Sequence, residues 1–489
     1  MKNTAQVIGL LFLIFWILKA LESFFPFGHG DPLYYHLVFS KMLFERGWYE
    51  THKNLCGVFQ SGAMEYLYIL PRLITNSNLS AQRLSQFMHF FLSIGVTSLF
   101  VWGLFKKQYP LIAALGGFIF LTFNKGSTFF LYAKNDGVTP FLLILFYVIF
   151  ISSQNINSQN TWIKKFNHPL VAGLILALMP LFKINGLISG GLFGLYYIWT
   201  QRRSVKNIIL CAIPPLCLVP WLFIRNWYFI KAPFFPGLLK VFPGILPASV
   251  VNTFVYFASS PPTFLSVIDN LKTFFFAKII FITIPFLVVV YLKTKKPLPK
   301  SIIFSFLIFT IAMITNGGIS AERFLFPCYF LNAFFILEFI FDFQLDKKKW
   351  FVWPFFIIIV LDSRIDIVIK RIKNEFLFQQ LKTEKVVTTM SPKAGVWEKL
   401  PNTALTILSD EWNEIYYAPK GTILHSSECT LQAGFLQECT QSDLSKLSSY
   451  DLFIIKRWAN NPCYDSIKES TPLLFKYEGY EFHGKIIQK

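Results

Sequence analysis

Residues 7–25, VIGLLFLIFWILKALESFF, form an apolar run long enough to cross a membrane as one helix. The hydrocarbon core of a bilayer is about 30 Å thick, which takes roughly 20 residues of α-helix. Residues 22–30 read ESFFPFGHG and offer no small-residue cleavage site. We therefore expect a retained first transmembrane span and not a removed signal peptide.

The composition of the whole chain is that of a membrane protein. Its 489 residues are 54% hydrophobic and 18% aromatic, and only 15% are charged. Apolar runs of membrane-spanning length recur along it, which predicts an all-α polytopic membrane protein with about 11 transmembrane helices. The predicted spans are centred near Leu13, Ile94, Ala114, Ile144, Leu176, Leu192, Leu216, Ile284, Phe306, Phe335 and Ile357.

The positive charge of the chain predicts its orientation. A formal net charge of +19 would suit nucleic-acid binding, but there is no basic stripe with interleaved aromatic residues and no nucleic-acid motif. The basic residues instead occupy every alternate loop, which places these loops and the N-terminus in the cytoplasm and the C-terminus outside. These loops contain Lys106 and Lys107; Lys164 and Lys165; Arg202, Arg203 and Lys206; Lys293, Lys295, Lys296 and Lys300; and residues 347–349.

The chain changes character near residue 374. Residues 1–373 form the predicted transmembrane domain, and residues 374–489 form a predicted small extracytoplasmic α/β domain, with a hairpin around Glu478 and Gly479. No GxGxxG or GxxxxGK[ST] motif marks a phosphate-binding loop. A disulfide can form in this tail if it faces an oxidising compartment, and the tail cysteines are Cys429, Cys439 and Cys463.

The first predicted outer loop, residues 28–80, is longer than a connection between two spans requires. Its amphipathic patterns, in residues 33–44 and 61–74, predict two helices that lie on the membrane surface. Asp31 and Pro32 start the first of them, since Asp is a favoured N-cap and Pro a favoured first helical residue. Capping alone is one explanation for Asp31.

Several other ionisable residues are predicted at the same, outer membrane face. Taken singly, each has a structural explanation, such as a long side chain that reaches the membrane surface. Taken together, carboxylates and cations at one depth of a membrane indicate a functional site, because ionisable groups there tend to face a cavity or one another. The set comprises Asp31, Glu65, Asp136, Lys183, Arg225 and Arg323.

The order of motifs along the chain resembles that of the GT-C superfamily of polytopic glycosyltransferases. The nearest group is the bacterial branch related to protein O-mannosyltransferases and aminoarabinose transferases, and the resemblance extends from Asp31 to about Pro327. The motifs are GDPLYYHLVFSKMLFERGWY (30–49), MEYLYILPRLI (64–74), AQRLSQFMHFFLSIG (81–95), YAKNDGVTPF (132–141), PWLFIRNWYFIKAPFFPGL (220–238) and AERFLFPCY (321–329).

The resemblance implies an enzyme of the bacterial inner membrane. It would transfer a sugar from a polyprenyl-phosphate donor to a lipid, polysaccharide or protein acceptor at the extracytoplasmic face, with inversion at the anomeric carbon. Asp31 matches the essential first-loop acid and is the expected general base. Pro32 follows it here, in place of the second acid of the paired version of this motif, which argues against direct metal chelation by Asp31.

The resemblance also implies roles for the remaining charged residues. Asp136 matches a second acid that orients the sugar or the acceptor, and Glu65 matches a glutamate of the first-loop helices. Either carboxylate can contribute to a divalent metal site, the one cofactor considered. The leaving phosphate needs fixed cations, and the expected phosphate contacts are Arg323, Arg225 and Lys183.

Two other classes of function remain open from the sequence. A polytopic transporter or lipid flippase would also place polar residues within apolar helices, but transporters commonly contain internal repeats and place their polar residues at mid-membrane. No such repeat is evident here. A non-catalytic glycan-assembly protein or receptor would use the tail as a binding module.

Overall fold

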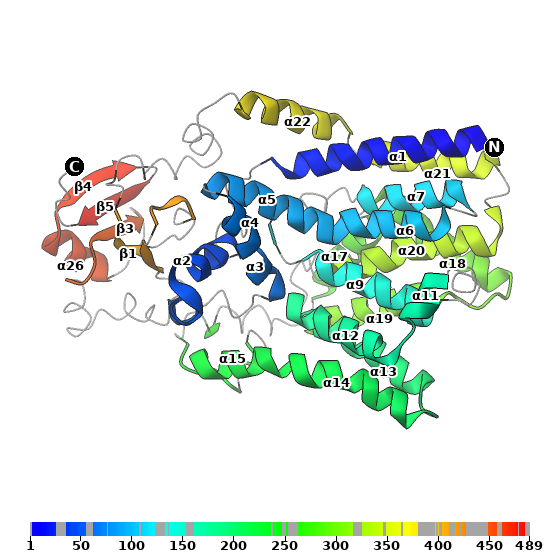
Figure 1. Cartoon of the computed structure of the whole chain (residues 1–489), viewed down its shortest axis with the longest axis horizontal. Helices are drawn as coiled ribbons and strands as arrows, with labels where there is room; N and C mark the ends of the chain where they lie inside the picture. Colours follow the sequence, from blue (N-terminus) through cyan, green and yellow to red (C-terminus); the bar gives the residue numbers. More distant parts are fainter. Residues whose placement is uncertain are drawn as a thin grey trace. The chain divides into compact units, whose positions relative to one another are not determined.

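The computed structural model divides the chain into two compact units (Figure 1). Unit 1 comprises Met1–Phe25, Gln86–Leu222 and Phe257–Glu375, and unit 2 comprises Pro26–Ser85, Phe223–Tyr256 and Phe376–Lys489. The structure describes residues 2–484 except 26–35, 55–61, 76, 107–108, 123–132, 135, 153–160, 236–237, 240, 247–250, 253–262, 277, 316–324, 346–348, 363–364, 380–396, 398–399, 401–402, 410–415, 421, 427–447, 457–461 and 478.

Unit 1 is helical in the part that the structure describes. All eleven predicted span centres lie inside helices of unit 1. The elements, of which α5, α15 and α22 extend into unit 2, are α1 (Lys2–Ser23), α5 (Asn78–Phe90), η3 (Phe91–Gly95), α6 (Val96–Phe105), α7 (Pro110–Leu121), α9 (Val138–Phe146), η4 (Tyr147–Ile151), α11 (Thr161–Phe166), α12 (Pro169–Phe182), α13 (Gly186–Thr200), α14 (Val205–Leu218), α15 (Pro220–Ile230), α17 (Phe264–Phe276), η5 (Ile279–Thr283), α18 (Ile284–Lys293), α19 (Lys300–Thr315), α20 (Phe326–Asp342), α21 (Lys349–Asp362) and α22 (Ile365–Gln379).

Three described stretches are long and apolar enough to cross a membrane as continuous helices: Gln6–Ser23, Asn78–Phe105 and Val205–Ile230. The bent pair Phe264–Phe276 and Ile279–Lys293 makes a fourth if it is counted as one span. The second stretch contains the π-helical turn η3, where Ser93 leaves helical geometry and its hydroxyl donates to the His89 carbonyl. The total of eleven spans remains a prediction.

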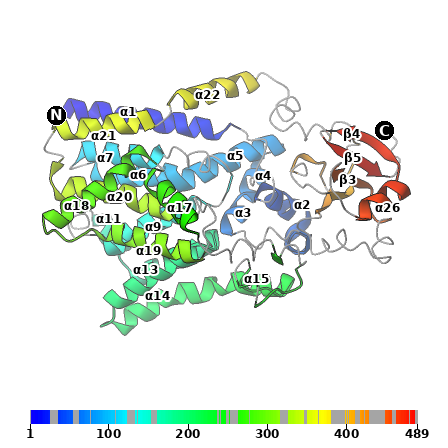
Figure 2. The same cartoon turned by 180° about the vertical axis from the view of Figure 1, so that it is seen from behind.

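Helix α20 lies among the other helices of unit 1 (Figure 2). Most of its side chains are buried. It packs against α19, α7 and α9. One acidic residue, Glu338, lies within this apolar helix and accepts hydrogen bonds from the hydroxyls of Tyr147, at 2.7 Å, and of Ser301. Both carboxylate oxygens are therefore satisfied, as burial of such a group requires.

Helices α12 and α14 pack closely because α12 has a glycine at the contact. A Cβ atom on Gly173 would lie 2.1 Å from the carbonyl oxygen of Cys211 and 2.9 Å from the Pro214 ring. The helices can approach to this distance only where no side chain intervenes, as in many membrane helix pairs.

Unit 2 contains a mixed sheet and short helices. The strands are β1 (Thr406–Ser409), β2 (Ile423–Ser426), β3 (Leu452–Lys456), β4 (Leu473–Tyr477) and β5 (Tyr480–Gly484), in the order β2-β1-β3-β5-β4. β1 pairs in parallel with β2 and β3, while β5 runs antiparallel to β3 and β4. The predicted hairpin is confirmed, and Gly479 in its turn has φ +83°, a conformation that favours glycine.

Unit 2 also includes most of α15 and the start of α5, and three of its helices come from the first predicted outer loop. They are α2 (Leu37–Asn54), α3 (Ala63–Leu67) and α4 (Ile69–Ile74). A further helix, α26 (Pro462–Ser470), packs on one face of the sheet, where Tyr464 and Ile467 join a buried cluster with Phe453 and Ile455. The sequence predicts helices in both places where α2 and the α3–α4 pair lie.

A short turn at residues 416–418 fastens the C-terminal residues of unit 2 to these helices. The buried ammonium of Lys41, in α2, donates to the carbonyls of Ala418, at 2.6 Å, and Tyr416, at 3.3 Å. The Tyr416 hydroxyl donates to the Asn78 carbonyl at 2.7 Å, and the Arg72 guanidinium lies 4.9 Å from the centre of the Tyr416 ring. The turn thereby holds α2, α4 and the start of α5 together.

We predict that Gly173→Ala destabilises unit 1 by about 1–3 kcal/mol, because the added methyl collides with backbone that cannot move without separating α12 from α14. Gly191→Ala in α13 is the matched control, since a Cβ there meets nothing within 4 Å. The control should be neutral or gain about 0.5–1 kcal/mol in helix propensity. Thermal unfolding of both variants in detergent measures the difference, and equal melting temperatures would contradict the packing argument.

We also predict a pH-dependent contribution of Lys41 to stability. Burial lowers the pKa of Lys41 from 10.5 to about 7, with Arg72 adding to the effect and Glu45 opposing it. Above about pH 7 the folded chain releases a proton that the unfolded chain keeps until about pH 10, so stability rises with pH over that window by up to about 1.4 kcal/mol per unit.

Lys41→Met should remove this rise, and Lys420→Met, at an exposed lysine, should keep it. The measurement is the unfolding midpoint of the three proteins in denaturant from about pH 6.5 to 10. Parallel curves for wild type and Lys41→Met would show that Lys41 does not titrate in this range.

Candidate functional site

The predicted site residues fall into two described clusters, one in each unit. Glu65 and Arg225 lie in unit 2, and Asp136 and Lys183 lie in unit 1. Asp31 and Arg323 lie outside the described residues. Each cluster is considered by itself.

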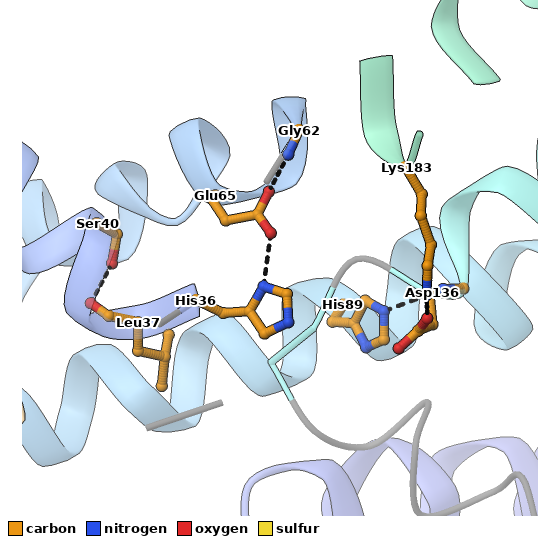
Figure 3. Close-up of polar contacts among 9 residues, drawn as sticks. His36, Leu37, Ser40, Gly62, Glu65, His89, Asp136 and Lys183 are labelled. Atoms are coloured by element: carbon orange, nitrogen blue, oxygen red, sulfur yellow. Dashed lines mark hydrogen bonds and ion pairs between the residues drawn. The ribbon is translucent and has the colours of Figure 1, made fainter. Parts of the chain in front are cut away.

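Glu65 in α3 is bound on both carboxylate oxygens (Figure 3). One oxygen, Oε2, accepts the backbone N–H of Gly62 at 2.9 Å, and the other, Oε1, lies 2.5 Å from Nδ1 of His36. Glu65 is 0% exposed and His36 1% exposed. A buried carboxylate is stable only with such partners, so this dyad fixes the orientation of the His36 ring.

Arg225 in α15 is buried beside an aromatic and histidine network in unit 2. Its Nε and Nη2 groups donate to the Asn226 side-chain oxygen at 3.1 and 3.0 Å, and its charge also interacts with the Tyr66 hydroxyl and with Glu65. The two predicted site residues of this unit therefore lie within electrostatic reach of each other.

His52 belongs to the same network as Arg225. Its Nδ1–H donates to the Trp48 carbonyl at 2.7 Å, and its Nε2 lies 3.1 Å from the Tyr66 hydroxyl. Burial lowers the pKa of His52 to about 4; the bond to Trp48 opposes this shift and the Arg225 charge adds to it. His52 is consequently neutral at pH 7, and its Nε2 accepts a hydrogen bond from the Tyr66 hydroxyl.

In unit 1, Lys183 and Asp136 form a direct ion pair (Figure 3). The Asp136 side chain is 1% exposed and that of Lys183 16% exposed. Lys183 caps the C-terminus of α12, and Asp136 precedes α9, where the next N–H, of Gly137, donates to Nε2 of the buried His89 at 3.3 Å. The backbone around Asp136 is thus held by a side chain from α5.

A small pocket opens at this ion pair. Lys183 is the one cation and Asp136 the one anion among the described residues that line it. Its walls come from the start of α9, the turn between α12 and α13, α19 and the start of α20. The lining residues are Asp136, Thr139, Pro140, Lys183, Asn185, Gly186, Ile188, Ser189, Ile308, Ala312 and Pro327.

The described residues do not assemble a metal site. No group of three or more His, Cys, Asp or Glu side chains converges within the described part of the chain. The two carboxylates considered as ligands are already engaged, Asp136 by Lys183, and Glu65 by His36 and Gly62.

The structure adds two histidines that the sequence interpretation did not single out. His36 lies in the first-loop motif and His89 in the apolar run QFMHFF, and both are buried. A signal was present for the first: Glu65 in an apolar segment requires a buried partner with a donor hydrogen. The identity of that partner depends on tertiary structure.

Comparison with known proteins gives structural matches only. No protein-family model matches the chain, and no curated protein matches its sequence. ArnT from Cupriavidus metallidurans superimposes with a TM-score of 0.64 in the apo state and 0.60 bound to undecaprenyl phosphate, at 12% and 10% identity, covering 99% of this chain and 98% of that one.

The archaeal oligosaccharyltransferase AglB from Archaeoglobus fulgidus is also similar, with a TM-score of 0.45 and 12% identity over 91% of this chain and 69% of that one. ArnT shows the fold of this chain, since the match extends over nearly the full length of both chains. ArnT is an aminoarabinose transferase of the GT-C superfamily. The chain has the fold of ArnT, which agrees with the fold that its sequence resemblance predicts.

Proposed function

We propose that the chain is a membrane glycosyltransferase that moves a sugar from a polyprenyl-phosphate donor to an acceptor on the extracytoplasmic face. The observation that carries this proposal is the end-to-end likeness to ArnT bound to undecaprenyl phosphate. Buried charged residues at the predicted site positions Glu65, Asp136 and Arg225 support it, because such groups are retained in apolar surroundings where function needs them.

The proposal includes the membrane arrangement predicted from the sequence. The chain would cross the bacterial inner membrane about 11 times, with the N-terminus in the cytoplasm and residues 374–489 outside as a small α/β domain. The basic loops that alternate along the sequence support this orientation. The division into a transmembrane domain and a C-terminal domain is supported by the helices around every predicted span centre and by the five-stranded sheet near the C-terminus.

Asp31 would act as the general base of the transfer. Its carboxylate accepts the proton of the acceptor hydroxyl or amine as the acceptor atom forms a bond to the anomeric carbon. The bond from that carbon to the phosphate oxygen breaks at the same time, and its electron pair leaves with the polyprenyl phosphate. Attack in line with the leaving group inverts the anomeric configuration.

Arginine side chains would stabilise the charge that grows on the leaving phosphate. Arg323 and Arg225 are the proposed contacts, because a guanidinium binds phosphate oxygens through two parallel N–H groups. Burial of Arg225 strengthens any such contact, since screening by water is weak there. Glu65 and Asn226 hold the guanidinium in one place before a donor arrives.

Replacement of the proposed base tests the enzyme assignment. Asp31→Asn keeps a helix-capping side chain but removes the base, so sugar transfer from a polyprenyl-phosphate donor should fall by about 10²–10⁴-fold. Asp269→Asn, at an exposed acid of unit 1, is the matched control and should retain full activity.

The assay uses purified chain in nanodiscs with radiolabelled donor lipid. Full activity of Asp31→Asn would show that the residue is only a cap. Movement of intact donor lipid across the membrane by the wild type, without any transfer, would favour the transporter or flippase class instead.

The phosphate contacts are tested separately by donor affinity. Arg323→Gln and Arg225→Gln should each weaken binding of polyprenyl phosphate by about 10-fold or more, as expected for loss of a charge-assisted hydrogen bond. Arg202→Gln, at an exposed arginine that lies over Trp199, is the control. Lipid binding and melting temperature are measured together, so that a misfolded variant is recognised. Unchanged affinity in both folded variants removes these arginines from the site.

A further inference from the structure

We propose that Tyr66 and His52 are positioning residues that orient the Arg225 guanidinium through a hydrogen-bond network of fixed direction. This inference rests on the proposed function, in which Arg225 contacts the donor phosphate, and adds two residues that act through that arginine. All three side chains belong to unit 2. His52 lies in α2, Tyr66 in α3 and Arg225 in α15, so the network connects three helices.

The direction of the hydrogen bonds is set at His52. Its Nδ1 lies 2.7 Å from the Trp48 carbonyl oxygen, which can only accept, so Nδ1 carries the ring proton. The ring is neutral at pH 7 because burial lowers the pKa of His52 to about 4. A neutral imidazole with its proton on Nδ1 has a lone pair on Nε2. The Tyr66 hydroxyl, 3.1 Å away, therefore donates to Nε2.

This direction makes the Tyr66 oxygen an acceptor toward its other neighbours. The indole Nε1 of Trp48 is a donor only and lies 3.3 Å from the Tyr66 oxygen. The Arg225 guanidinium, which also only donates, hydrogen-bonds to the same oxygen. If the hydroxyl hydrogen pointed at Arg225, it would repel the guanidinium. Because His52 takes that hydrogen, the lone pairs of the phenol face Trp48 and Arg225 instead.

Aromatic packing holds the two rings in this geometry. His52 stacks on Phe229, with ring centroids 5.1 Å apart and an angle of 22° between the planes. Phe39 contacts both rings edge-on, with its centroid 5.4 Å from that of His52 and 5.2 Å from that of Tyr66. Phe229 follows Arg225 by one helical turn in α15, so the two side chains lie on the same face of that helix. This face of α15 is therefore held against α2.

Tyr66 adds a constraint on Arg225 beyond that of Asn226. Asn226, the next residue of α15, accepts from Nε and Nη2 of the guanidinium at 3.1 and 3.0 Å. That contact orients the guanidinium relative to its own helix, whereas the contact with Tyr66 orients it relative to α3. An arginine side chain has many rotamers to lose when a ligand binds. A guanidinium that is already fixed by two helices loses less of this freedom on binding a phosphate.

The affinity of the full chain in nanodiscs for bare polyprenyl phosphate tests this inference. Tyr66→Phe removes the hydroxyl and keeps the ring, and it should weaken binding by about 5-fold or more, as expected when a charged group loses a hydrogen-bond partner. Tyr228→Phe is the matched control, because it makes the same change at a tyrosine of α15 that is 59% exposed. The control should change the affinity by less than about 2-fold.

Two amides at position 52 separate orientation from packing. The side-chain oxygen of glutamine reaches about as far as Nε2 of histidine, so His52→Gln keeps an acceptor for the Tyr66 hydroxyl. The amide nitrogen of asparagine reaches only as far as Nδ1, so His52→Asn keeps the bond to Trp48 and loses that to Tyr66. His52→Gln should retain the wild-type affinity within about 2-fold, and His52→Asn should lose as much as Tyr66→Phe. Equal loss in the two amide variants would overturn the inference.

A double-mutant cycle shows whether Tyr66 acts through Arg225. In the Arg225→Gln background, Tyr66→Phe should cause less than about 2-fold further loss, because the guanidinium that it orients is gone. Additive losses would show that Tyr66 acts independently of Arg225 and would overturn the inference. Unchanged affinity in folded Tyr66→Phe, or in folded Arg225→Gln, would overturn it as well. Melting temperatures of all variants, measured in the same nanodiscs, identify those that are folded.

Sugar transfer by the wild type judges the proposed function separately. Transfer that persists while Tyr66→Phe binds the lipid normally would refute the positioning role and leave the glycosyltransferase assignment intact. Absence of transfer, together with selective loss of affinity in Tyr66→Phe and His52→Asn, would support the positioning role at a lipid-phosphate site and refute the enzyme assignment.

Discussion

Charged side chains in apolar surroundings need partners, and this constraint organises the polar interior of the chain. An ion moved from water into a low-dielectric interior loses several kcal/mol of solvation even after relaxation. Glu22 in α1 illustrates the response: its two carboxylate oxygens contact Lys19 and Arg371, each at 2.8 Å. Glu338 is satisfied instead by two hydroxyls. Each described arrangement joins residues far apart in sequence or one turn apart on a helix.

The same constraint distinguishes structural from functional charge. Glu22 and Glu338 are fully engaged by neighbours, and neither lines the pocket at Asp136. Asp136 is also paired, but its pair forms one wall of a pocket. A carboxylate whose neutrality is already provided can contribute hydrogen bonds to a ligand without demanding a counterion from it. The position of an acid beside a pocket is therefore a better guide to function than its burial alone.

The sequence predicts helices and strands well here because their signals are local. Each of the eleven apolar runs coincides with a helix, and the alternating runs near the C-terminus locate β1, β2 and β3. Span length is less predictable, since it depends on where prolines and π-turns interrupt a run, as Pro180 and Ser93 do in α12 and η3. Whether such an interruption ends a helix depends on neighbouring helices that satisfy the freed backbone groups.

The sequence indicates which charged residues stand out, but it does not indicate which residues they contact. Glu65 and Asp136 are conspicuous as acids within or beside apolar segments, yet nothing local connects Glu65 to His36, 29 residues earlier. The partner determines the chemistry: a carboxylate held by His36 and the Gly62 N–H has a fixed orientation. Likewise, nothing local connects Lys183 to Asp136, 47 residues earlier in the sequence. Residue type in the sequence therefore limits which reactions are chemically feasible, and the pairing in the fold determines which ligand each charged group can receive.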